Sequence, residues 1–150
     1  MTSPLFAPGT AHRDPRQVDD LAGVVDLVET CSPVYLRYSE GPLADERDGP
    51  SRDYEADVQL PGLSVTTVEP EAWWPRATIE WVARRLLKYA ELGAERDRYP
   101  WLLTGQIAGY GPDHEPLIVN ARPLARIGSK ALRQAESVYR QHFRVGQDST

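Results

Sequence analysis

The sequence predicts one α+β domain, with about four strands in a single mixed or antiparallel sheet that three helices pack against. The first observation behind this prediction is size: the chain has 150 residues, 41% of them hydrophobic, which suits one core and not two full domains. The second is pattern. Apolar residues recur three or four positions apart in three stretches, and four other stretches are short runs of strand-forming residues. Such elements are typical of helices packed on a sheet.

The first half of the chain contains one expected helix and two expected strands. Asp14 and Pro15 have the chemistry of a helix N-cap and first turn, and the apolar spacing that follows predicts a helix over residues 15–30. Residues 34–38 and 63–68 are the expected strands, because both runs are rich in β-forming side chains and are bounded by glycine and proline.

The second half contains two expected helices and a hairpin. An apolar stripe over residues 79–90, followed by Gly93, predicts the second helix. Residues 101–107 and 116–120 are expected strands joined by a long turn. The stripe from Leu132 to Phe143 predicts the third helix, with Ser129 as its N-cap and Gly146 at its end. We expect one domain over residues 14–146, a disordered lead-in over 1–13 that stays outside the core, and a tail over 147–150.

The negative charge of the chain is concentrated in one segment. The formal net charge is −5, and residues 40–57 alone hold seven acidic and two basic side chains. Such a segment repels phosphate, so we expect no nucleic-acid partner. The segment also lies in a long loop between two expected strands, and loops of this length are typical of functional or mobile sites. Asp53 is our candidate binding residue within it.

Cysteine content and hydropathy exclude several classes of protein. Cys31 is the one cysteine, which excludes an internal disulfide and a multi-cysteine zinc site. The chain has no apolar stretch long enough to cross a membrane, and its start lacks the basic and apolar regions of a secretory signal. We therefore expect a cytoplasmic protein with no membrane contact. We expect no metal site, because adjacent side chains such as Asp113 and His114 rarely converge on one ion.

Three segments combine polar side chains with glycine at the ends of expected strands, namely residues 35–42, 60–65 and 109–116. Together with the pair Trp73-Trp74 and residues 101–105, they resemble an uncharacterised domain family of actinobacteria, over about residues 33–143. The resemblance implies a compact bacterial domain and no particular activity. From these segments we take Tyr35, Tyr110, Asp113 and His114 as candidate binding residues, on the premise that they gather around one hollow.

The second helix offers a candidate contact surface. Trp81 falls on its charged side, opposite the apolar stripe, and we expect this indole to be exposed beside Arg84, Arg85 and Lys88. An exposed indole among cations is typical of a contact site for an acidic partner, and residues 40–57 of the same chain or of a second copy are one such surface. The alternative is a solvated face on which Glu80 pairs with Arg84.

Two hypotheses for the function follow. The first is a non-enzymatic module, monomeric or homodimeric, that binds a protein or small molecule without a cofactor. The second is an enzyme that transfers ADP-ribose from NAD. Four residues follow the order Arg, Ser-x-Thr, Glu that such enzymes commonly present: Arg37, Ser64, Thr66 and Glu115. The guanidinium would hold the pyrophosphate, the hydroxyls the ribose, and the carboxylate would stabilise an oxocarbenium-like transition state.

The same four residues have a structural alternative. Arg37 can pair with the acidic loop, Ser64 can cap a turn, and Glu115 can remain solvated in the hairpin. Because single residues in a matching order arise easily by chance, we prefer the binding module.

Overall fold

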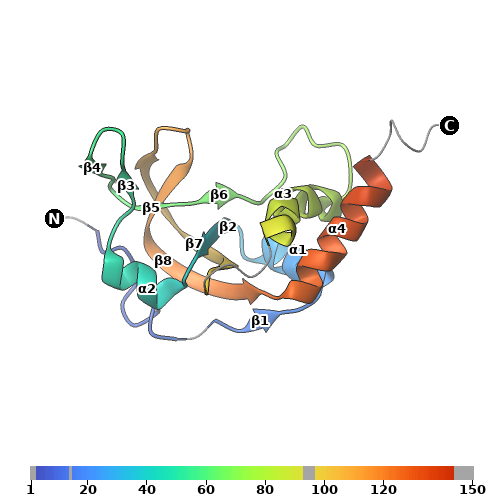
Figure 1. The fold of residues 1–150 in the computed structure, drawn as a ribbon, viewed down its shortest axis with the longest axis horizontal. Helices are drawn as coiled ribbons and strands as arrows, with labels where there is room; N and C mark the ends of the chain where they lie inside the picture. Colours follow the sequence, from blue (N-terminus) through green and yellow to red (C-terminus); the bar gives the residue numbers. More distant parts are fainter. Residues whose placement is uncertain (1–2, 14, 93–96, 144–150) are drawn as a thin grey trace.

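The computed structural model describes residues 3–13, 15–92 and 97–143 (Figure 1). Within them the helices are α1 (Leu21–Thr30), α2 (Pro42–Asp48), α3 (Thr78–Leu92) and α4 (Ser129–Phe143). The strands are β1 (Gln17–Val18), β2 (Tyr35–Ser39), β3 (Arg52–Asp53), β4 (Val58–Gln59), β5 (Leu63–Ser64), β6 (Thr66–Thr67), β7 (Tyr99–Tyr110) and β8 (Pro116–Ile127). The α+β class is confirmed, but the expected three helices and four strands were too few.

The main sheet is curled, and one extended segment, residues 63–67, pairs with strands on both sides of the curl. Its strand order is β1-β8-β7-β2-β6, and β5 pairs with β8 beside this path. β5 and β6 are two halves of one extended segment that changes partner at Val65, where the backbone N–H donates to the carbonyl of Pro116 at 3.2 Å. Since β5 pairs with β8 and β6 pairs with β2, this segment closes the curl.

Two hydrophobic cores lie on the two faces of the curled sheet. On one face α1, α3 and α4 pack together at one end of the molecule (Figure 1), over a core that includes Leu36 and Leu102. The other face lines the inside of the curl with a second core that includes Tyr35, Trp101 and Leu103. Because side chains alternate along a strand, β2 directs Leu36 toward the helices and Tyr35 and Arg37 into the curl.

The predicted start of the first helix was wrong by six residues. We expected a helix over residues 15–30, whereas Gln17 and Val18 form β1, which runs parallel to the end of β8. The helix begins only after Asp20, whose backbone is extended at φ −113° and ψ 136°. Backbone pairing with a strand more than a hundred residues away therefore overrides the local helical pattern. Asp14, Gly93 and Gly146, which we assigned to helix ends, lie outside the described residues.

The expectation that residues 1–13 stay outside the core was also wrong for the described part, 3–13. Phe6 is 3% exposed and belongs to the core inside the curl, where its ring stacks on Trp101. Its neighbour Ala7 donates its backbone N–H to Ala121 of β8 at 2.9 Å. The early segment therefore covers the curl.

The long acidic loop contains a helix and a small hairpin. Pro42 stands at the first turn of α2, and Gly41 before it and Gly49 after it have φ of 112° and 84°, which a side chain rarely allows. The hairpin that follows consists of β3 and β4. Of the helices that the structure describes, none is long and apolar enough to cross a membrane.

Candidate functional site

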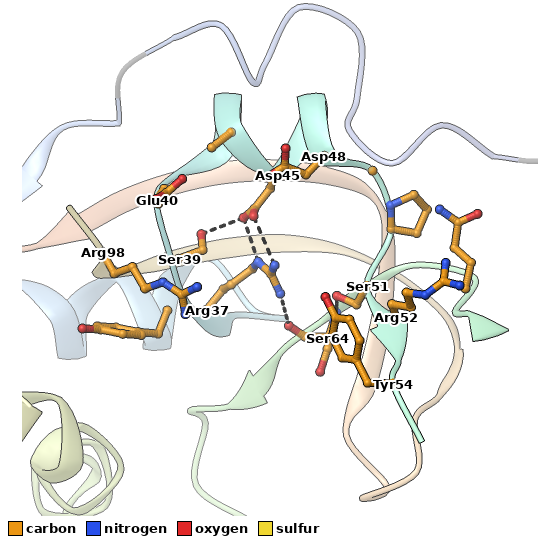
Figure 2. A pocket seen from close by; sticks show the side chains of 15 residues that line it. Arg37, Ser39, Glu40, Asp45, Asp48, Ser51, Arg52, Tyr54, Ser64 and Arg98 are labelled. Atoms are coloured by element: carbon orange, nitrogen blue, oxygen red, sulfur yellow. Dashed lines mark hydrogen bonds and ion pairs between the residues drawn. The ribbon is translucent and has the colours of Figure 1, made fainter. Parts of the chain in front are cut away.

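A pocket of about 530 Å³ opens between α2, the β3–β4 hairpin and the ends of β2 and β5 (Figure 2). Its polar lining comes from five parts of the chain: Arg37, Ser39, Glu40, Asp45, Asp48, Ser51, Arg52, Tyr54, Gln59, Ser64 and Arg98. Ten of the eleven lie between residues 37 and 64, where α2, the β3–β4 hairpin and β5 follow β2, and Arg98 joins them from just before β7.

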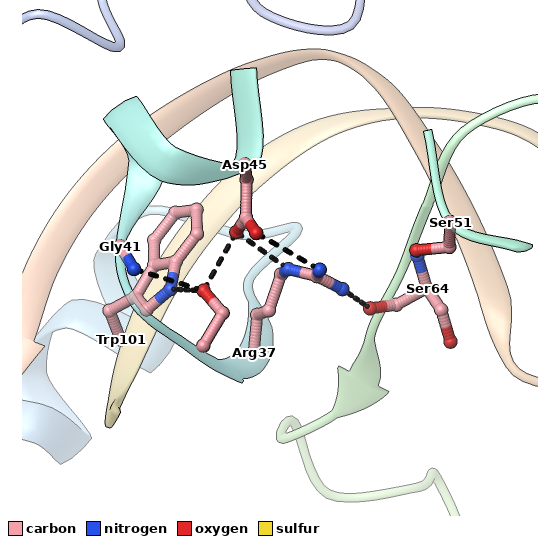
Figure 3. A network of polar contacts seen from close by, with 7 residues as sticks. Arg37, Gly41, Asp45, Ser51, Ser64 and Trp101 are labelled. Carbon is pink, nitrogen blue, oxygen red and sulfur yellow. Dashed lines mark hydrogen bonds and ion pairs between the residues drawn. The ribbon is translucent and has the colours of Figure 1, made fainter. Parts of the chain in front are cut away.

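An ion pair between Arg37 and Asp45 forms the floor of this pocket (Figure 3). The Nε of Arg37 donates to Oδ2 of Asp45 at 2.7 Å, and its Nη2 donates to Oδ1 at 3.1 Å. The remaining Nη1 donates to the backbone carbonyl of Ser64 at 2.7 Å. Two parallel bonds between a guanidinium and a carboxylate fix both groups in direction as well as distance. The Arg37 side chain therefore joins α2 to β5.

Ser39 extends the same network toward the core (Figure 3). Its hydroxyl donates to Oδ2 of Asp45 at 2.7 Å and accepts from the indole Nε1 of Trp101 at 2.9 Å. It also accepts from the backbone N–H of Gly41 at 3.1 Å. Because Ser39 and Asp45 are buried, these bonds offset the loss of their contacts with water. The floor of the pocket is thus rigid and internally satisfied.

The rim of the pocket is different from its floor. The guanidinium of Arg98 and the carboxylate of Glu40 are exposed, and neither makes a hydrogen bond or ion pair with the described residues. Tyr54, in the turn between β3 and β4, is 86% exposed. Arg52 pairs with Asp57 at 2.6 Å near the protein surface. Charged groups and an aromatic ring are therefore available to a ligand at the rim.

The structure brings together two of the four residues of the ADP-ribosyl hypothesis. Arg37 and Ser64 both line the pocket, but the Arg37 guanidinium is already engaged by Asp45. Thr66 and Glu115 do not line the pocket. Glu115 accepts a hydrogen bond from the backbone N–H of Asp113, inside its own hairpin turn, at 2.9 Å.

The candidate binding residues do not gather around one hollow. Tyr110, Asp113 and His114 are exposed at the β7–β8 turn, and none of them lines the pocket. Tyr35 is buried inside the curl, where desolvation raises the pKa of its hydroxyl, with smaller contributions from the charges of Glu69 and Tyr110.

Asp53 lies in the β3–β4 hairpin beside the pocket without lining it. Its Oδ1 accepts hydrogen bonds from the backbone N–H groups of Glu55 and Ala56, both at 3.1 Å. Such contacts shape the turn that carries Tyr54. Asp53 therefore stabilises the turn at the rim of the pocket and does not itself line the pocket.

The expectation that Trp81 is exposed was wrong. Its side chain is 4% exposed, because Trp73 and Trp74 pack edge-on against it and Arg85 lies 5.0 Å above its ring. The exposed indole on this side of the molecule is Trp73, at 64%. Arg84 is exposed, as expected.

Sequence reasoning did not select three residues that line the pocket: Asp45, Tyr54 and Arg98. A signal for Asp45 was present, because Pro42 between Gly41 and Gly49 indicates a short helix in the acidic segment. No local pattern marks Arg98 or Tyr54. Among the described residues, no group of three His, Cys, Asp or Glu side chains could hold a metal ion.

Comparison with known families gives one result. A family model described as "Family of unknown function (DUF6098)" matches residues 11–149. The chain belongs to this family. All residues that line the pocket fall within the DUF6098 match, whereas Phe6 precedes it. No significant match was found among curated proteins or among solved structures.

Proposed function

We propose that the chain is a non-enzymatic module that binds a small polar molecule without net charge in the pocket beside α2. The observation that carries this proposal is the contrast between floor and rim. The buried floor groups around Asp45 satisfy one another, while Glu40, Arg98 and Tyr54 remain available at the rim. A rigid polar floor with open groups above it is suited to recognition, because little order is lost when a ligand binds.

The charges of the lining support a ligand of this class. The lining contains three guanidinium groups, of Arg37, Arg52 and Arg98, and three carboxylates, of Glu40, Asp45 and Asp48. A balanced lining favours ligands that offer both donors and acceptors, such as a sugar or a zwitterionic amino acid. The exposed ring of Tyr54 adds a flat apolar face on which such a ligand can stack.

The same contacts make catalysis an inferior explanation. The hydroxyl of Ser39 and the carboxylate of Asp45 are engaged with each other, and among the described residues no histidine or cysteine lines the pocket. Three of the five N–H donors of Arg37 are engaged by Asp45 and Ser64, so its guanidinium is committed to the fold.

A titration followed by two-dimensional NMR tests this proposal. Monosaccharides and amino acids are added at millimolar concentration to the ¹⁵N-labelled chain, and we expect one compound class to shift the amides of Gly49, Ser51 and Ser64. Tyr54→Ala should weaken that binding about fivefold through the loss of stacking. Tyr110→Ala removes another exposed tyrosine and should have no effect.

Two results would contradict the proposal. One is the absence of any saturable shift at these amides with both compound panels. The other is a ligand whose affinity Tyr54→Ala and Arg98→Gln leave unchanged, because binding would then occur elsewhere on the molecule.

One observation also favours self-association. Trp73 is 64% exposed, and exposed Arg84 lies in the same pocket lining as this indole. Figure 1 places α3 toward one end of the molecule and α2 and β3, which belong to the acidic segment 40–57, toward the other, so contact between these surfaces requires two molecules. Sedimentation velocity of Trp73→Ala combined with Arg84→Glu tests it. Self-association in the parent chain that this variant abolishes supports the contact, whereas equal masses overturn it.

A further inference from the structure

A second pocket, of about 460 Å³, lies where α3 and α4 meet the ends of β7 and β8. We infer that this pocket binds a small anion that carries an apolar body. It is separate from the pocket beside α2, and Arg98 is the one residue in both linings.

The charge of the lining is the first step. Three arginines surround the pocket: Arg98, Arg126 and Arg133. All three are exposed, and Arg98 and Arg133 make no hydrogen bond or ion pair with the described residues. Arg126 stacks its guanidinium 3.9 Å above the ring of Tyr99, and within the part of the chain that the structure describes it forms no ion pair. Like charges around one cavity repel each other, and an anion between them removes the repulsion.

The nearby carboxylates have other partners. Among the described residues Glu136 is the one acidic residue in the lining, and its Oε1 pairs with Arg140 at 3.2 Å. Asp20 pairs with Lys130 at 3.2 Å, and this contact lowers the pKa of the Asp20 carboxyl. Asp19 accepts from the side-chain amide of Gln17 at 2.7 Å. Within the described residues, the three guanidinium groups are therefore left to a ligand from solution.

The floor of the pocket is apolar. Tyr89 and Ile127 are buried and belong to the core beneath the helices, and Leu132 packs against that core. Pro100 adds a buried ring at the start of β7. An inorganic ion could meet the arginines but not this floor. The arrangement therefore fits an anionic head group, carboxylate or phosphate, attached to an aromatic or acyl body.

Phenyl phosphate is a suitable probe. Phenol, which lacks the charge, and inorganic phosphate, which lacks the ring, are its controls. We expect phenyl phosphate to shift the amides of Arg98, Ile127 and Leu132, and to bind at least about tenfold more tightly than either control. Benzoate should shift the same amides if the head group can be any anion. Affinities come from the same NMR titrations.

Arg126→Gln combined with Arg133→Gln should weaken phenyl phosphate binding at least about tenfold. Both residues are exposed and outside the first pocket, so the variant leaves that site intact. Arg122→Gln is the matched control, because it removes an exposed positive charge from β8 outside both pockets and should leave binding unchanged. Arg133→Gln alone serves if the double variant does not fold.

Three results would overturn the inference: no saturable shift at these amides, equal affinity for phenol, or equal affinity in the variants and the parent chain. A footprint at Gly49 and Ser51 would likewise overturn it, because the anion would then occupy the first pocket. The proposal for the first pocket stands or falls separately, through Tyr54→Ala.

Discussion

Arg37 of β2 and Asp45 of α2 form a two-bond ion pair at the end of the curled sheet, with N–O distances of 2.7 and 3.1 Å. Asp45 is 6% exposed and is the one charged residue that is buried in the described part of the chain. The helix that carries it has seven residues, of which Pro42 and Asp45 are buried. Such a short helix has little apolar surface to pack, so this ion pair and the hydrogen bond from Ser39 to Asp45 tie it to β2.

Removal of one partner should therefore be costly. Asp45→Ala leaves the Arg37 charge unpaired in a partly buried site, and we expect it to lower the free energy of unfolding by about 3 kcal/mol. Asp48→Ala, in the same helix but 64% exposed, should change it by less than about 0.5 kcal/mol. Urea unfolding measures both. Equal changes in the free energy of unfolding for the two variants would show that the buried ion pair contributes no more to stability than an exposed one.

Gly62 allows the segment before β5 to approach β8. A Cβ atom at this position would lie 2.7 Å from the carbonyl oxygen of Ile118 and 2.9 Å from its nitrogen, both backbone atoms that cannot move aside easily. We expect Gly62→Ala to destabilise the fold by about 2 kcal/mol through overpacking. At Gly109 the nearest atom would be 3.7 Å away, so Gly109→Ala is the control. Identical melting temperatures would contradict the tight closure.

Trp81 and Trp73 should respond oppositely to substitution. Trp81 is 4% exposed, and Trp81→Ala should cost about 3 kcal/mol of stability because it leaves a large cavity. Trp73 is 64% exposed, and Trp73→Ala should cost less than about 1 kcal/mol. Chemical denaturation of both variants decides between these roles. If Trp81→Ala is as stable as the parent chain, the conclusion that Trp81 is a buried core residue is wrong.

Phe6 should contribute to stability although it lies outside the family match. Its ring is 3% exposed and stacks on Trp101, with 6.5 Å between ring centroids. We expect Phe6→Ala to lower the free energy of unfolding by about 3 kcal/mol. Leu43→Ala, at a 55% exposed site, should have almost no effect and serves as the control. Thermal unfolding that does not distinguish the two variants would place residues 3–13 outside the cooperative unit.

Tyr35 should make the fold sensitive to alkaline pH. Desolvation raises the pKa of its hydroxyl in the folded chain, so the unfolded chain loses this proton first. Its contribution is complete below the ordinary tyrosine pKa of about 10 and is lost as the pH rises through the higher folded value. Stability of the parent chain should therefore fall more steeply above that pH than stability of Tyr35→Phe. Tyr54→Phe, at an exposed site, should keep the parent slope; three equal slopes would refute the prediction.

Local pattern was sufficient for the elements with the strongest periodicity. The apolar stripe over residues 79–90 predicted α3, and the stripe from Leu132 predicted α4. It was insufficient where backbone pairing comes from far away. Val18 has a helical neighbour pattern, yet it pairs with Ile127 in a strand. The segment 63–68 was predicted as one strand, and only its two different partners divide it at Val65.

The candidate site was predictable in part. Arg37 and Ser64 were selected from sequence and both line the pocket, and the structural alternative that Arg37 pairs with the acidic loop holds through Asp45. Asp113 and His114 were selected by the same reasoning and lie in the exposed turn between β7 and β8. The order of residues in the sequence does not distinguish the first pair from the second, because the curvature of the sheet cannot be inferred from local sequence.

The sequence by itself determined which residues share a face of an element, since the periods of helix and strand follow from backbone geometry. Only the tertiary structure decided what covers each face. Trp81 lies on the charged side of α3 and is nevertheless buried, because Trp73 and Trp74 fold back over it. The pairing of Arg37 with Asp45 is also decided by the tertiary structure. The fold places α2 over the end of β2, and a charge that is buried there requires an opposite charge beside it.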